Sequence, residues 1–275
     1  MVQASETAPS KALLLLEGRA LPELFGFAAT IPALKVVAPR GDGHPVLVLP
    51  GLATSDGATL TLRRFLRSKN YVTYGWKMGF NFGPRPGVEQ GLIELVEEIY
   101  EKHGRKLSIV GWSLGGIYAR QLAKMMPDKV RQVISLGSPF GGEPQATNAW
   151  RVYTLLCGEA PEDGHHHMGG HIKDAPKHVP TTAIYSKLDG ICAWQNCLEE
   201  DTALTENIEV KASHCGLGHH PAVVFAIADR LAQKEGEWTR FDRSGVRAAL
   251  YPEPSYRKKG MPVEPSHDMM AVAAE

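Results

Sequence analysis

The middle of the chain alternates between short apolar runs and longer segments in which apolar residues recur at helical spacing. Residues 45–50 form a continuous apolar run between glycines, which is typical of a strand buried on both faces. Residues 88–103 carry an apolar stripe at helical spacing that ends at Gly104. The same patterns predict strands at 71–77, 107–110, 130–136, 181–185 and 208–210, and helices at 58–68, 115–126 and 221–233. This alternation implies an α/β protein whose mostly parallel sheet has helices on both faces.

Three segments depart from the alternation. Residues 11–37 have helical spacing, and we expect Pro22 and Pro32 to divide them into short pieces. Residues from about 141 to 180 contain Gly, Pro and five histidines, and they predict a short cap or lid insertion over the carboxyl edge of the sheet. Residues from about 236 to 275 are polar with scattered prolines, and they predict an extended, weakly ordered arm. We expect the whole chain to form a single domain.

Composition excludes several classes of protein. The 275 residues include 30 Lys and Arg against 30 Asp and Glu, and this zero net charge argues against a nucleic-acid partner. The longest apolar run near the start, residues 12–16, is much shorter than the ~20 residues of a membrane span and lacks the features of a signal peptide. Four cysteines in so long a chain do not make a disulfide scaffold. We therefore expect a cytoplasmic protein with no integral membrane segment; no pattern indicates its oligomeric state.

The strongest chemical signal is Gly-Trp-Ser-Leu-Gly at 111–115, which lies between a predicted strand and a predicted helix. A serine at such a sharp turn is held in a strained backbone conformation that exposes its hydroxyl, and the helix that follows directs its amino terminus at the site. Without that context the pattern would describe a glycine-rich turn with an idle serine. In this context it predicts Ser113 as a nucleophile.

A nucleophilic serine needs a histidine base within hydrogen-bond reach and a carboxylate that orients the base. In folds with a serine at this turn, the acid and then the histidine follow it along the chain. Asp189 comes just after the strand predicted at 181–185 and precedes a glycine, so it is the preferred acid. The rival acids form a cluster that is more typical of a solvated loop: Glu199, Glu200 and Asp201.

The base is expected on the loop that follows the last predicted strand. His214 lies shortly beyond that strand and is the preferred base. His219 and His220 remain alternatives, because they directly precede Pro221 and the last predicted helix.

The oxyanion that forms during acyl transfer needs two backbone amide donors. The amide of Leu114 follows the nucleophile and is the first candidate. The second donor is expected on the loop that leaves the strand at 45–50, where Leu52 is the preferred residue.

Taken together, these motifs resemble the α/β-hydrolase superfamily and, within it, the small lipase and carboxylesterase-like proteins. The matching stretches are residues 45–56, 75–84, 107–120, 137–142, 181–194 and 212–231. The resemblance implies an α/β-hydrolase fold with Ser113 as nucleophile, Asp189 as acid, His214 as base, and Leu52 and Leu114 as oxyanion donors. Pro50-Gly51 stands where these proteins often have His-Gly, a change that leaves the backbone amide in place.

Other residues allow less specific interpretations. Residues 150, 153 and 156 lie three apart, so that Trp150, Tyr153 and Leu156 predict either a substrate pocket under a lid or plain packing on the sheet. The consecutive histidines 165–167 are more typical of a solvated segment than of a metal site. A zinc site built from Cys192, Cys197, Cys215 and His219 is a weak alternative, and a Cys197–Cys215 disulfide is a hypothesis.

The sequence as a whole predicts a serine esterase or lipase that needs no cofactor and no metal. Its expected substrate is a small-molecule or lipid-like ester. Transfer of the acyl group to another alcohol, or cleavage of an amide or another bond, is the alternative that uses the same residues. A binding module that keeps the fold without catalysis is the alternative from a different class.

Overall fold

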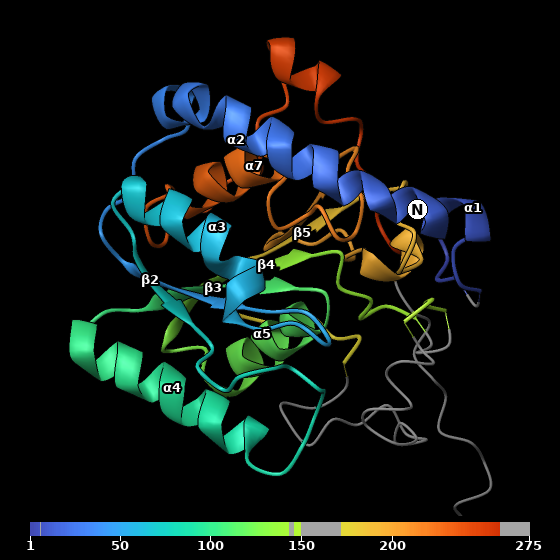
Figure 1. Cartoon of the computed structure of the whole chain (residues 1–275). Coiled ribbons are helices and arrows are strands. Elements are labelled where there is room, and N and C mark those ends of the chain that lie inside the picture. The colour runs from blue at the N-terminus through green and yellow to red at the C-terminus, as the bar shows by residue number, and fades with distance from the viewer. Residues whose placement is uncertain (6, 143–145, 150–171, 259–275) are drawn as a thin grey trace, which may run out of the picture.

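The computed structural model of the protein describes residues 1–5, 7–142, 146–149 and 172–258 (Figure 1). Within these residues, a six-stranded sheet has the order β2-β1-β3-β4-β5-β6, and every pairing is parallel. The strands are β1 (Pro45–Leu49), β2 (Val72–Gly75), β3 (Leu107–Trp112), β4 (Val130–Leu136), β5 (Thr181–Tyr185) and β6 (Thr205–Glu209). The parallel sheet predicted from the alternation of strands and helices is confirmed.

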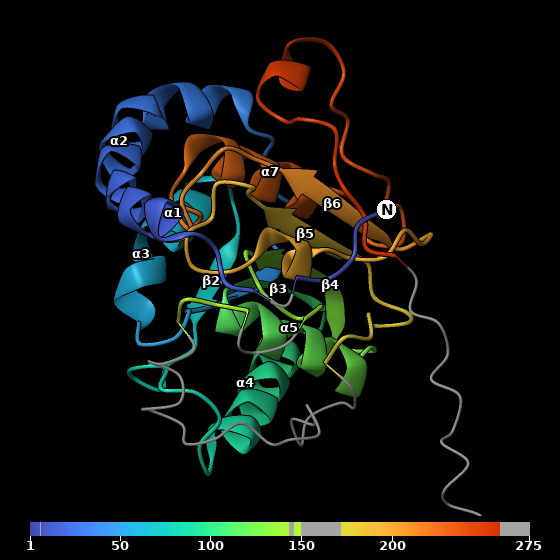
Figure 2. The same ribbon diagram turned by 90° about the vertical axis from the view of Figure 1, so that its right-hand side faces the viewer.

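Helices cover both faces of the sheet (Figures 1 and 2). The described helices are α1 (Lys11–Leu15), α2 (Ala20–Val37), α3 (Asp56–Ser68), α4 (Val88–His103), α5 (Leu114–Met125) and α7 (Pro221–Leu231), with 3-10 turns η1 (Leu16–Arg19), η2 (Trp194–Cys197) and η3 (Gly245–Ala249). One hydrophobic cluster packs α4 and α5 on one face, and another packs α2, α3 and α7 on the other. Every residue of β1, β4 and β5 is consequently buried, as expected of strands covered on both sides.

The N-terminal helical stretch is longer than the sequence pattern predicted. α1, η1 and α2 follow one another without a break from Lys11 to Val37, and the prolines do not divide them. Pro22 lies in the first turn of α2, directly after the 3-10 turn η1, where a proline is tolerated. Pro32 lies on the exposed side, where water can bind the carbonyl it leaves unbonded. By length and composition this stretch is able to cross a membrane. Its uninterrupted apolar run, residues 12–16, is too short to indicate this.

The C-terminal segment packs against the rest of the protein as far as residue 258. Tyr251 is 1% exposed and donates its hydroxyl hydrogen to the carbonyl of Ala222. Ser255 donates its backbone N–H to the hydroxyl of Tyr185, and Arg257 donates its N–H to the carbonyl of Glu199. This segment therefore closes one edge of the hydrophobic core.

The predicted cap at 141–180 is described only at 141–142, 146–149 and 172–180, so the division of the chain into one domain, a cap and an arm stays a prediction.

Candidate active site

Ser113 occupies the turn between β3 and α5. Its backbone has φ 52° and ψ −119°, a conformation that is strained for any residue with a Cβ. The backbone N–H of Ser113 donates to the carbonyl of Leu136 at 2.8 Å, and the Ser113 carbonyl accepts the N–H of Gly116 at 3.0 Å. These bonds hold Ser113, which is partly exposed, at the carboxyl end of β3.

Close backbone contacts explain the glycines around Ser113. A Cβ on Gly111 would lie 2.3 Å from the carbonyl oxygen of Gly115, and a Cβ on Gly115 would lie 2.5 Å from the carbonyl oxygen of Leu49. Both distances are too short for a methyl group, and the obstacles are backbone atoms. The two glycines thus let β1, β3 and α5 approach one another beneath the serine.

We expect Gly115→Ala to destabilise the fold by about 1–3 kcal/mol, because the added methyl group overpacks a site walled by backbone. Chemical unfolding monitored by circular dichroism measures this change. Gly26→Ala in α2 is the matched control, since a Cβ there meets nothing within 4 Å and alanine favours the helix. A Gly115→Ala protein as stable as the parent would contradict the close packing described here.

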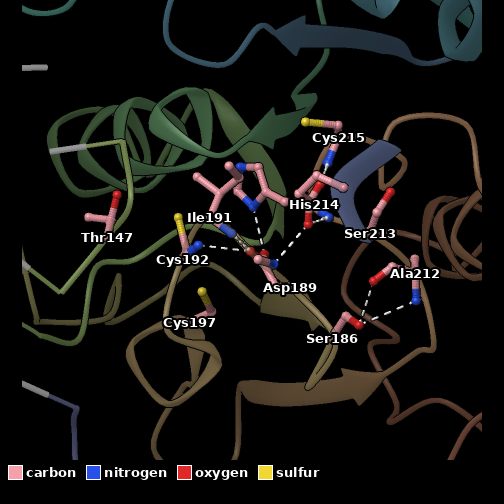
Figure 3. Close-up of polar contacts among 12 residues, drawn as sticks. Thr147, Ser186, Asp189, Ile191, Cys192, Cys197, Ala212, Ser213, His214 and Cys215 are labelled. Carbon is pink, nitrogen blue, oxygen red and sulfur yellow. Dashed lines mark hydrogen bonds and ion pairs between the residues drawn. The ribbon is translucent and has the colours of Figure 1, made fainter. Parts of the chain in front are cut away.

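Asp189 lies on the loop that follows β5, and both of its carboxylate oxygens are bonded (Figure 3). Oδ1 accepts the backbone N–H groups of Ile191 and Cys192, each at 2.8 Å. Oδ2 accepts a hydrogen bond from Nδ1 of His214 at 2.6 Å. Gly137, directly after β4, leaves room for this pair: its φ is 56°, and a Cβ there would lie 3.0 Å from Nδ1 of His214.

His214 lies on the loop that follows β6 and is only 6% exposed. Its backbone carbonyl accepts the indole N–H of Trp112 at 3.1 Å, which joins the His214 loop to the residue before Ser113. No hydrogen bond joins Ser113 itself to His214 or Asp189 among the described residues. In unliganded enzymes such a contact is often long and tightens when substrate binds. The structure thus brings the predicted acid and base together and places the serine at the same edge of the sheet.

The environment of His214 favours its charged form. Burial alone lowers the pKa of the imidazole, but the adjacent Asp189 carboxylate outweighs burial and raises that pKa above its ordinary value. The nearby Cys192 thiol stays neutral, because burial raises its pKa to about 12. An imidazole that gains a proton readily next to a fixed carboxylate has the character of a catalytic base.

The rival acids and bases have other partners. Glu199 is fully buried in an ion pair with Arg120 of α5. Glu200 pairs with Arg257, and Asp201 pairs with Arg240. His219 contacts the carbonyl of Ala20, and the His220 ring accepts the N–H of Ala222 at the start of α7. These bonds give structural roles to all five rivals.

Cys197 and Cys215 do not form the disulfide that was one hypothesis for them. Cys192, Cys197 and Cys215 are free thiols; Cys197 is buried against the carbonyl of Ala193, whereas Cys215 is exposed. The four residues considered for zinc do not converge either: in the described part of the chain, the group with mutually close ligand atoms is Asp189, Cys192 and His214. That group is the acid–base pair with one neighbouring thiol.

The predicted pocket residues Trp150, Tyr153 and Leu156, and the histidines 165–167, lie outside the described residues.

The expected oxyanion donors have amides suited to that role. Leu114 is the first residue of α5, so its N–H has no carbonyl four residues earlier within the helix. The loop that carries Leu52 is braced by Asn81, which is fully buried and donates its side-chain amide to the carbonyl of Pro50 at 2.8 Å. Asn81 also exchanges backbone hydrogen bonds with Ala53 and Thr54. Sequence reasoning matched the stretch around Asn81 to the family but assigned no role to it.

We expect Asn81→Ala to lower kcat for ester hydrolysis by about 10–100-fold with little change in KM, because a displaced Leu52 amide weakens transition-state binding. Steady-state kinetics on a soluble ester measures both constants. Gln90→Ala, which removes an exposed side-chain amide from α4, is the control and should leave both constants unchanged. An increase in KM alone would show that Asn81 acts on substrate binding and not on the oxyanion loop.

A second Ser–His–Asp arrangement lies at the opposite, amino-terminal edge of the strands. His44 contacts Asp42 through Nδ1 and the hydroxyl of Ser108 through Nε2 at 2.8 Å. His44 and Ser108 are fully buried, and burial together with Arg131 lowers the pKa of His44 to about 4. A substrate has no access to this serine, so the arrangement is a structural link between β1 and β3.

A carboxylate from the N-terminal helical stretch joins the loops of Asp189 and His214, a link that the sequence did not predict. Oε1 of Glu17 accepts the N–H of Gly190 at 2.8 Å and the N–H of His214 at 3.0 Å, and Oε2 accepts the N–H of Cys215 at 2.9 Å. Burial raises the pKa of Glu17, but these three hydrogen bonds outweigh it and lower the pKa overall. Glu17 therefore fixes the acid loop and the base loop relative to each other.

Comparison with known proteins places the fold. No protein-family model matches the chain, and no curated protein matches it by sequence. Among solved structures, lipase B of Aspergillus fumigatus matches with a TM-score of 0.51 and 19% identity over 71% of this chain and 54% of its own, so the chain spans about half of that lipase. A variant of the pyrethroid hydrolase PytH matches with a TM-score of 0.50 and 18% identity over 68% of this chain and 96% of its own. The lipase BlEst2 of Bacillus licheniformis, in its mature form, has a TM-score of 0.49 and 16% identity over 70% of this chain and 92% of its own. Lipase B and the PytH variant share the fold that the sequence resemblance implied, and the fold prediction is confirmed.

Proposed function

We propose that this chain, which has the α/β-hydrolase fold, is a serine hydrolase that cleaves carboxylic esters. The observation that supports this most is the 2.6 Å hydrogen bond between His214 and Asp189, at the sheet edge where Ser113 occupies a strained turn. A nucleophile, a base and an orienting acid at one edge are the parts that acyl transfer to water needs.

The proposed reaction has two halves. In the first, Nε2 of His214 takes the proton of the Ser113 hydroxyl as Oγ attacks the ester carbonyl, and the imidazolium then gives that proton to the departing alcohol. In the second, the same imidazole deprotonates a water molecule that attacks the acyl-serine, and the imidazolium then returns that proton to Oγ of Ser113 as the acid leaves. Asp189 keeps Nδ1 protonated and stabilises the imidazolium in both halves. The amides of Leu52 and Leu114 bind the oxyanion of each tetrahedral intermediate.

We propose a small-molecule or lipid-like ester as substrate, and the cytoplasm as compartment. The three free thiols among the described residues fit a reducing environment. A bond other than an ester, or an acceptor other than water, would use the same residues in the same roles.

A series of p-nitrophenyl esters of increasing acyl length tests the proposal. We expect turnover with a chain-length optimum, and release of free acid as the main product. Adding a primary alcohol separates the alternatives, since an acyltransferase would form the new ester in preference to the acid. A purified, folded chain that turns over no ester in the series, and that fluorophosphonates do not label, would favour a binding module.

A further inference from the structure

Most of the exposed side chains of the helical stretch Lys11–Val37 are apolar, whereas the charged residues in its middle, Glu17, Arg19 and Glu23, face the protein, which is unusual for a surface helix. Leu15 is 84% exposed, Leu21 62% and Phe25 70%. We call the exposed apolar residues of this stretch the outer face: Ala12, Leu14, Leu15, Leu16, Leu21, Leu24, Phe25, Ala28, Ala29, Ala33, Val36 and Val37. α2 runs along the outside of the molecule above α3 and α7 in Figure 1, so that this face points away from the sheet.

The charged side chains in the middle of the stretch bind the catalytic loops. Glu17 bonds three backbone amides there, as described above, and Glu23 accepts both the N–H and the hydroxyl hydrogen of Ser213. Arg19 donates to the carbonyls of Leu188 and Ala212, which lie on the acid loop and the base loop. Further along, Phe27 and Leu34 are buried in the hydrophobic core. The inner side of the helix is thus built into the protein.

These inner contacts argue against a helix that spans a membrane. Moving the stretch into a bilayer would leave the backbone amides of Gly190, His214 and Cys215 without their acceptor and would bury charged side chains in hydrocarbon. A helix that keeps its inner contacts and offers its outer face can instead lie along a membrane surface.

The charges that flank the outer face indicate what binds it. Among residues 11–40, the exposed charged residues are Lys11, Lys35 and Arg40, which are all cations at the two ends, and none of them has an ion-pair partner in the described part of the chain. In a symmetric pair of antiparallel helices, Lys11 of one copy would lie near Lys35 of the other, with no acid on the face to offset the repulsion. Anionic lipid headgroups complement both ends at once.

We propose that the outer face docks flat on an anionic membrane surface, with its Leu, Phe and Val side chains at the boundary between headgroups and acyl chains. Docking holds Glu17 and Glu23, and with them the loops of Asp189 and His214, next to the lipid. The docking does not depend on catalysis; its consequence, hydrolysis of an ester held in or near the membrane, rests on the proposed function.

Co-sedimentation with vesicles tests the docking. The protein is the full chain carrying Ser113→Ala, so that lipid hydrolysis cannot change the vesicles. We expect binding to vesicles of phosphatidylcholine with phosphatidylglycerol, weaker binding to pure phosphatidylcholine, and a loss of affinity of about tenfold or more in the double variant Leu21→Glu/Phe25→Glu. Val72→Glu, which adds a carboxylate to a partly exposed apolar position on the edge strand β2, is the matched control and should bind like the parent. Lys11→Gln/Lys35→Gln should weaken binding to the anionic vesicles only.

Four results would overturn the proposal. The parent protein could bind neither the anionic nor the pure phosphatidylcholine vesicles. The Leu21→Glu/Phe25→Glu protein could bind the anionic vesicles with the same affinity as the parent. Bound protein could resist extraction at high pH, which would indicate a spanning helix. Finally, a dimer that this double variant abolishes, with no vesicle binding by the parent, would indicate a second copy as the occupant. Circular dichroism checks that each variant is folded. If the Leu21→Glu/Phe25→Glu protein is unfolded, the single variant Leu15→Glu takes its place in the assay.

Discussion

Replacing Ser113 with alanine is expected to lower kcat/KM for ester hydrolysis by about 10⁵-fold or more, because the proposed mechanism has no other nucleophile to form the acyl-enzyme. The hydroxyl lies in a turn that the glycines at 111 and 115 and two backbone hydrogen bonds hold in place. Removing one oxygen atom from this turn creates no clash, so the variant should fold and bind substrate as the parent does. Steady-state kinetics on the best p-nitrophenyl ester measures the loss.

Ser108→Ala is the matched control for this substitution. Ser108 also stands in a Ser–His–Asp arrangement, but it is buried at the opposite edge of the sheet. We expect its loss to lower the free energy of unfolding by about 1 kcal/mol through the broken hydrogen bond with His44, and to leave kcat/KM unchanged within about twofold. The reverse pattern, with activity lost in the Ser108 variant and kept in the Ser113 variant, would mean that the site has been assigned to the wrong edge.

Asp189→Asn is expected to lower kcat by about 10³–10⁴-fold and to change its pH dependence. The side-chain amide that replaces the Asp189 carboxylate no longer fixes the tautomer of His214 and no longer stabilises the imidazolium. The base must be neutral to act, so activity falls as the pH drops through the pKa of His214. Asp189 raises that pKa and burial lowers it. With the carboxylate gone, the largest cause that raises the pKa is lost while burial still lowers it, and the acid limb of the pH–rate profile should therefore move to lower pH.

Asp201→Asn tests whether this effect is specific. Asp201 was a rival for the acid role, and the structure pairs it with Arg240 at the surface. We expect its rate and pH profile to match those of the parent within about twofold, since surface ion pairs contribute little. An unchanged pH profile in the Asp189 variant, despite a lower rate, would show that Asp189 is not the partner that sets the pKa of the base.

Much of the fold could be predicted because local pattern and tertiary environment agree. The apolar run at β1 and the stripe of α4 are signals that depend only on burial, and the structure buries both. β6 was harder: the apolar pattern placed it at 208–210, whereas it begins at Thr205. Glu206 in this strand is buried in an ion pair with Arg230. Because its partner is distant in the sequence, the local pattern of polar residues predicts a loop there.

The site divides in the same way. Ser113, Asp189 and His214 could be proposed from the sequence because each follows a predictable strand in a fixed chain order, and the carboxyl ends of parallel strands meet at one edge. Asn81 and Glu17 were missed, since each acts through backbone groups that are remote in sequence and leave no motif. The hypothesis of a Cys197–Cys215 disulfide could not be decided from the sequence for a related reason: the order of two cysteines along a chain does not say which way their side chains point.

The most direct measurement of the central claim is the site of covalent labelling by a fluorophosphonate, mapped by mass spectrometry of the digested protein. Such a probe reacts with a serine that a neighbouring base activates and an oxyanion hole supports. We expect one adduct, on the peptide that contains position 113, and its loss when His214 is replaced by glutamine. Ester turnover by the parent without an adduct there, or with the adduct on another serine, would contradict the account.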